Sequence, residues 1–263
     1  MILRPARSIL TCFLALACLP ANPLTARAED PLPVVHGVTL ERASAGEVTE
    51  ILRKNGMPIC FEEAPSSETL SVMEAIAELE KIPAGERTNL EKARLATLAI
   101  MLKNDPNSAV RLTKLKRFHF ECVAADNDPP KMLDALVAAD PAYAWKQLGT
   151  RYVVYPRAGS RLDPPVAAFT AKAQPYPILL ATLNKDVFAA WSVHCSGLFG
   201  PRNAATLTKR YTVELGPTTG WQLLQTVADQ FGPNVIWVEQ STTEGRTLYF
   251  TDAHLVGHLH PWN

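Results

Sequence analysis

The stretch that decides the fold is RFHFECVAADNDPPKMLDALVAADPAYAWKQLGTRYVVYP, residues 117–156. It opens with apolar and polar residues in alternation over 117–123, a period typical of a half-buried strand. Asp128 is expected to cap a helix that has Pro129 in its first turn, where a missing N–H costs nothing. Asp140 precedes a proline, which disfavours the helical conformation, and it therefore ends that helix.

The second half of the same stretch predicts a β-hairpin. Two short runs, 143–148 and 152–155, flank Gly149-Thr150, which is a suitable turn between strands. Residues 117–156 are thus expected to form a strand, a helix and two further strands.

Two other stretches repeat this order. Residues 38–63 begin with the strand VTLER, continue with a helix that the capping-box pair Ser44 and Glu47 opens, and end in the short strand MPICF. Residues 211–252 give a strand, an amphipathic helix and a hairpin. Residues 185–198 are expected to add a separate helix. Three related units favour duplication of a scaffold over a single catalytic centre.

An insertion, residues 64–116, separates the strand at 57–61 from residues 117–156. Apolar spacing predicts two helices in it, and Thr88 and Glu91 form the capping box of the second. A helical hairpin packed beside the sheet is the natural interpretation. Its apolar stripe is either buried or a partner-binding surface.

The predicted fold class is α+β: repeated strand–helix–strand units form small mixed sheets with helices on one face, plus the inserted helical hairpin. The expected organisation is a signal peptide at 1–28, a first α+β domain at 29–157 with its insertion at 64–116, a proline-rich linker at 158–177, a second related α+β domain at 178–252, and a mobile C-terminal tail at 253–263.

The first 28 residues are typical of a secretory signal. Arg4 and Arg7 precede an apolar run over 9–19, and an A-x-A pattern stands before Glu29. The run is short for a membrane span, so we expect no transmembrane helix in the mature chain, although a retained anchor is the alternative. Cys18 lies in a sequence resembling a lipidation box, which is a second alternative. The expected location is the periplasm or the extracellular medium.

The charge balance argues against nucleic-acid binding. The chain has 26 basic and 26 acidic residues, and the 1–28 segment carries three arginines and no acid, so its removal leaves a net charge of −3. No basic patch stands out.

Three cysteines follow the signal segment: Cys60, Cys122 and Cys195. An exported chain meets an oxidising compartment, where one disulfide and one free thiol are possible. Cys60 and Cys122 are expected on strands of one sheet, and pairing between them is favoured. The alternative is three buried thiols, since free cysteine packs well in a core.

Residues 38–64 (VTLERASAGEVTEILRKNGMPICFEEA) and 118–156, taken without the insertion, resemble the secretin and TonB N-terminal short domain. Leu52, Asn55-Gly56 and Ile59 carry the resemblance in the first half. In the second half it is carried by Leu133, Ala135-Leu136, Tyr143 and the run Tyr152-Val153-Val154. The resemblance implies a small mixed sheet with two helices that docks to other envelope proteins or associates with itself.

Motifs for chemistry are scarce. The sequence has no glycine-rich phosphate loop, nucleophile elbow, H-E-x-x-H or C-x-x-C, and no cofactor is expected. His194-Cys195-Ser196 combines reactive residue types, but neighbours in sequence point apart. In the tail, His254, His258 and His260 either hold a zinc-like ion or are solvated histidines of a mobile segment.

The favoured hypothesis is an exported, non-enzymatic interaction module of the bacterial cell envelope. It would dock to an envelope protein partner, or self-associate, through its sheet edges. The alternatives are a metal-assisted hydrolase that uses the C-terminal histidines and a lipid-anchored structural protein of the envelope.

Overall fold

The computed structural model describes residues 37–66, 68–122, 128–199, 209–242 and 245–253. These residues belong to one unit, Pro33–Asn263. They confirm the α+β class. Within them, no helix combines the length and the apolar character needed to cross a bilayer.

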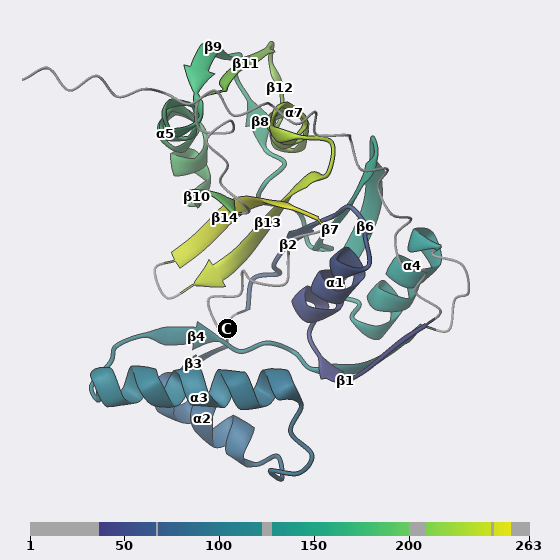
Figure 1. Cartoon of the computed structure of the whole chain (residues 1–263), viewed down its shortest axis with the longest axis vertical. Coiled ribbons are helices and arrows are strands. Elements are labelled where there is room, and N and C mark those ends of the chain that lie inside the picture. The colour runs from purple at the N-terminus through teal and green to yellow at the C-terminus, as the bar shows by residue number, and fades with distance from the viewer. Residues whose placement is uncertain (1–36, 67, 123–127, 200–208, 243–244, 254–263) are drawn as a thin grey trace, which may run out of the picture. The chain divides into compact units, whose positions relative to one another are not determined.

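The first half of the fold contains two strand–helix units (Figure 1). The first unit is β1 (Val38–Ala43), α1 (Ala45–Lys54) and β2 (Ile59–Glu62). The second is β5 (Phe118–Cys122), α4 (Pro129–Ala139) and the hairpin of β6 (Tyr143–Leu148) and β7 (Arg151–Pro156). The expected capping box at Ser44 and Glu47 is present in α1.

The second half has the same arrangement. Its first unit is β9 (Phe169–Pro175), α5 (Tyr176–Asp186), the short 3-10 helix Phe188–Trp191 and β10 (His194–Phe199). Its second unit is β11 (Arg210–Leu215), α7 (Gly220–Phe231), β13 (Val235–Thr242) and β14 (Gly245–Asp252). The described part of the chain therefore contains four strand–helix units, one more than the sequence predicts.

The additional unit covers residues for which the sequence predicts a linker, at 158–177, and a single helix, at 185–198. The helix expected over 185–198 is wrong, because α5 ends at Asp186 and residues 194–199 form β10. Ser192 adopts a left-handed conformation, with φ of 54°, which interrupts the helical geometry between them. The stretch 158–177, expected as a linker, contains β9 and the short strand β8 (Pro165–Val166), which pairs with β12 (Thr218–Thr219).

The strand pairing is duplicated between the halves. In the first half, β1 pairs antiparallel with β5, β2 pairs parallel with β7, and β6 pairs antiparallel with β7. In the second half, β9 pairs antiparallel with β11, β10 pairs parallel with β14, and β13 pairs antiparallel with β14. A parallel pairing of β13 with β2 joins the halves in one six-stranded sheet, in the order β10-β14-β13-β2-β7-β6.

The parallel joint places the helices of the two halves on opposite faces of this sheet (Figure 1). In the first half, Trp145 of β6 donates to Asp134 of α4, and Phe61 of β2 contacts Gly46 of α1. On the other face, the neighbouring Lys146 lies over Trp221 of α7. Each half keeps its helices on one face, as predicted, but among the described residues the face of β13 and β14 away from α7 carries no helix of its own half.

The inserted hairpin consists of β3 (Thr69–Ser71), α2 (Val72–Glu80), α3 (Asn89–Asn104) and β4 (Arg111–Thr113). The helical hairpin expected over 64–116 is therefore present, closed by a two-stranded ladder between β3 and β4. It has an apolar core of its own, separate from the main one, made of Val72, Ala75, Leu79, Leu98 and Leu112. This core accounts for most of the predicted apolar stripe.

Candidate functional site

A cavity of about 340 Å³ opens beside the helix-free face of β13 and β14. Its walls come from three parts of the fold: α1, the strands β2, β13 and β14, and the β4 and α3 segments of the inserted hairpin. The hairpin therefore takes the place that a helix occupies elsewhere on the sheet, and it leaves a hollow lined by charged and aromatic side chains.

Arg53 is the most deeply buried cationic residue of this cavity. It lies in the last turn of α1, where the helix leads into β2, and is 3% exposed. Its Nη1 donates to the carbonyl of Ile59 at 3.4 Å, and its Nε has no hydrogen-bond partner. Burial lowers the pKa of this guanidinium, but arginine keeps its charge in proteins. A buried positive charge with an unused donor thus faces the cavity.

Arg94 enters the cavity from the opposite side, on α3 of the hairpin. It is half-buried, and no hydrogen bond or ion pair within 4 Å engages it among the described residues. Burial lowers its pKa, and the nearby charge of Arg117 lowers it further, while Glu47 and Glu63 act in the opposite direction. Arg94 therefore lies within range of these three charges but forms no hydrogen bond or ion pair with another described residue.

The carboxylates of the cavity already have donors. Glu47 accepts from the main-chain N–H of Ser44 and from Arg117 Nη1, both at 2.8 Å. Glu63 accepts from the main-chain N–H of Ser241. The remaining acids are ion-paired in the same way: Glu50 with Lys54, Glu68 with Lys114 and Asp140 with Lys116. Arg53 and Arg94 are thus the cationic side chains of the cavity that none of these carboxylates binds.

An aromatic wall completes the cavity. Phe61 and Tyr143 stack with their ring centroids 5.6 Å apart, and the Tyr143 hydroxyl accepts from the main-chain N–H of Ala64 at 3.0 Å. Tyr249 of β14 is buried beside them, and burial raises its pKa to about 12. Both phenols therefore stay neutral at physiological pH, and the wall is apolar with polar tips.

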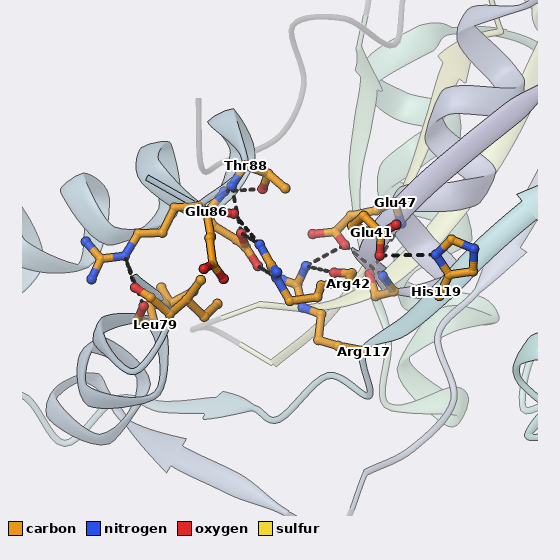
Figure 2. A network of polar contacts seen from close by, with 12 residues as sticks. Glu41, Arg42, Glu47, Leu79, Glu86, Thr88, Arg117 and His119 are labelled. Carbon is orange, nitrogen blue, oxygen red and sulfur yellow. Dashed lines mark hydrogen bonds and ion pairs between the residues drawn. The ribbon is translucent and has the colours of Figure 1, made fainter. Parts of the chain in front are cut away.

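A polar network connects the hairpin to β1 at the rim of this region (Figure 2). Arg42 Nε donates to Glu91 of α3 at 3.2 Å, and Arg42 also donates to the carbonyl of Glu86. Its own carbonyl accepts from Arg117 Nη1 at 2.9 Å. Arg42 has a φ of 53°, at an irregularity in the β1 ladder. That left-handed backbone is unfavourable for arginine, so these contacts help to maintain it.

A second polar cluster lies at the joint between the halves. Glu239 of β13 and Glu62 of β2 are cross-strand neighbours, and both side chains are fully buried. Arg246 forms an ion pair with Glu239, and Ser160 donates to Glu62. Burial raises the pKa of Glu239 to about 6 and also raises that of Glu62. Two acidic groups are therefore packed where the halves meet.

The two edges of the six-stranded sheet differ. At β10, Asn184 of α5 donates from Nδ2 to the Cys195 carbonyl at 2.9 Å and accepts from the Cys195 N–H at 2.7 Å. The amide thereby occupies the outward groups of Cys195 as a neighbouring strand would.

At the opposite edge, β6 has β7 on one side. Leu148 and Arg151 flank the two-residue turn, and the Arg157 N–H donates to the Ala142 carbonyl at 2.8 Å. Because hydrogen-bonded pairs alternate in an antiparallel ladder, the main-chain groups of Trp145 and Gln147 point away from β7.

Of the residues singled out in the sequence, His194, Cys195 and Ser196 do not line this cavity. His254, His258 and His260 fall outside the described residues, and within the described ranges no cluster of potential metal ligands occurs. His194 is exposed and Cys195 buried, so successive side chains on β10 point to opposite faces. His119 is exposed and pairs with Glu41 at 3.1 Å (Figure 2).

All three cysteines are buried, and Cys60 and Cys122 are free thiols in this structure. Cys60 lies on β2 of the six-stranded sheet, whereas Cys122 lies on β5 of the two-stranded β1-β5 sheet. The expectation that they share one sheet is therefore wrong. β5 pairs with β1, as β11 pairs with β9 in the second half.

Comparison with family models, curated proteins and solved structures gives no match for the chain.

Proposed function

We propose that this protein is an exported, non-enzymatic interaction module of the bacterial cell envelope, which docks to a protein partner through the β6 edge of its sheet. The observation that carries the proposal is a difference between the edges. Asn184 occupies the outward groups of Cys195 at one end, whereas at the other end Asp140 and Arg157 bind the outward groups of Tyr143 at the start of β6, and those of Trp145 and Gln147 remain for a partner. Unpaired edge groups are a template for an added strand.

The side chains around β6 favour pairing with one specific partner strand over unspecific strand pairing. Trp145 is fixed by its bond to Asp134 at 2.9 Å, and Lys146 lies 3.5 Å from the centroid of the Trp221 ring. The edge strand is thus held on both faces. The charge of Lys146 restricts unspecific pairing, while main-chain groups of Trp145 and Gln147 remain for one partner strand.

The resemblance of residues 38–64 and 118–156 to the secretin and TonB N-terminal short domain supports docking within the envelope. The signal-like segment over 1–28 supports export to the periplasm or beyond. A metal-assisted hydrolase would depend on His254 and His258, outside the described residues, and a lipid-anchored envelope protein would depend on modification of Cys18.

The test is site-specific photocrosslinking in cells. A photoreactive amino acid at Gln147, exposed on the β6 edge, should give a discrete crosslinked product with an envelope protein. The same group at Lys131, exposed on α4, is the matched control and should not give that product. Equal products at both positions, or none at Gln147, would contradict docking at β6.

A proline at Gln147 gives a second test. Proline removes one outward N–H, while the bonds from β6 to β7 use the alternate residues. Gln147→Pro should abolish the partner crosslink from a nearby position and leave the fold intact by circular dichroism. Lys146→Pro removes an inward bond and serves as the variant that disturbs the sheet itself.

A further inference from the structure

Two arginines of the 340 Å³ cavity keep donors that the protein does not use. Arg53 is 3% exposed with an unpartnered Nε, and Arg94 has no partner within 4 Å among the described residues. For the buried Nε of Arg53, the lack of an acceptor is unfavourable by about 1–3 kcal/mol. Because arginine stays protonated, Arg53 does not escape this cost by losing its charge. An incoming acceptor would remove this cost.

The protein's own carboxylates do not supply that acceptor. Glu47 is bound by Arg117, Glu50 by Lys54 and Asp140 by Lys116. Glu63 lies close enough to raise the pKa of Arg94, but its carboxylate accepts from the Ser241 N–H. The nearby negative charge of Glu63 offsets part of the positive charge of the two arginines. A ligand with one negative charge is therefore favoured over a ligand with two.

The rest of the wall defines the other part of a ligand. Phe61, Tyr143 and Tyr249 present aromatic surface, with Val238 beside them. A volume of about 340 Å³ matches the lower end of the range for small-molecule pockets, roughly 300–1,000 Å³. The cavity has room for one ring-sized group, and it lies on the face of β13 and β14 that the hairpin, rather than a helix, covers.

We propose that this cavity is a binding site for a small monocarboxylate with an apolar or aromatic body, whose carboxylate is received by Arg53 while Arg94 supplies positive charge from the opposite wall. The body would lie against Phe61, Tyr143 and Tyr249. The site is separate from the β6 edge, so the two proposals succeed or fail independently.

The probe is phenylacetate, measured by isothermal titration calorimetry on the chain that begins at Glu29. 2-Phenylethanol, phenethylamine and phenyl phosphate share its ring but carry no charge, a positive charge and a second negative charge. Phenylacetate should bind at least about tenfold more tightly than each of them, as expected for a charge-assisted bond to arginine. Equal binding of the alcohol or the amine, or tighter binding of the phosphate, would overturn the proposal.

Arg94→Gln is the decisive variant, since it replaces a half-buried arginine and removes no side chain of the apolar core. It should weaken phenylacetate binding about tenfold or more while the melting temperature stays close to that of the parent. Arg111→Gln is the matched control: Arg111 also lines the cavity but is exposed and lies 3.5 Å from Glu74, and its loss should change binding less than about threefold.

Arg53→Lys adds a check from the α1 side. Lysine keeps the charge but loses the guanidinium fork, so binding should weaken where the variant remains folded. Should Arg53→Lys fail to fold, Arg94→Gln still decides. Unchanged affinity in Arg94→Gln, or no saturable binding of phenylacetate up to about 10 mM, would overturn the assignment.

Discussion

Asn184 hydrogen-bonds to both main-chain groups of Cys195, at 2.9 and 2.7 Å, and so ends the sheet at β10. By the duplicated topology, β10 corresponds to β2, and the outward side of β2 is the one on which β13 pairs. The strand corresponding to β13 is β6, at the other end of the sheet. Without the Asn184 cap, the two edge strands of one molecule would be β10 and β6. They correspond to β2 and β13, which already pair with each other inside the fold.

Asn184→Ala is predicted to promote head-to-tail association, because it frees the Cys195 groups for the β6 edge of a second molecule. Sedimentation should show an average mass that rises with concentration more steeply than in the parent. Asn184→Ala combined with Gln147→Pro should reverse the effect. An unchanged mass at all concentrations in the single variant would argue against this role of the cap.

Local sequence signals account for much of this fold. The capping boxes at Ser44 and Thr88 are present where the sequence predicts them, since both partners lie within one helical turn. The hairpin turn at Gly149 is equally local. The unit formed by β9, α5 and β10 was missed because residues 185–198 combine helix-like apolar spacing with a left-handed Ser192, which no composition signal marks.

The cavity could not be anticipated in the same way. Arg53 and Arg94 lie on separate helices, and each has the ordinary appearance of a solvated helix charge. What brings them together is the position of the hairpin, and that depends on long-range contacts such as Arg42 with Glu91. Burial without a partner is a property of tertiary structure, so no local motif reports it.

Gly220→Ala is predicted to destabilise the protein by more than about 2 kcal/mol. An added Cβ would lie 2.0 Å from the Leu162 carbonyl oxygen and 2.7 Å from Trp191, and the Gly220 N–H is bonded to the Pro164 carbonyl. The backbone would have to move at the start of α7. Urea unfolding measures the loss. Gly216→Ala, with nothing within 4 Å of the new atom, is the control and should change stability little.

The thiols of Cys60, Cys122 and Cys195 are predicted to be inert in the folded protein. Cys60 has 0% exposure, and burial raises the pKa of its thiol to about 12, so almost no thiolate is present at neutral pH. In the chain that begins at Glu29, alkylation without reductant should label none of the three natively and all three after unfolding. Labelling of one thiol alone after unfolding would instead reveal a disulfide.

The joint between the halves predicts a loss of stability at neutral pH relative to mild acid. Glu239 has its pKa raised by burial from 4.5 to about 6, so the folded state binds this proton more tightly than the unfolded state does. Its favourable contribution is complete below pH 4.5 and is lost as pH rises through about 6, a change of about 2 kcal/mol. Glu62 has its pKa shifted in the same direction and adds to the effect.

Glu239→Gln tests this directly, because glutamine keeps an acceptor for Arg246 and has no proton to lose. Unfolding free energies measured by urea titration at intervals between pH 4 and 7 should fall less steeply with pH in the variant than in the parent. Glu68→Gln, which removes an exposed carboxylate, is the control and should leave the slope as it is in the parent. A parent slope that Glu239→Gln does not alter would mean that Glu239 is not the group that titrates at the joint.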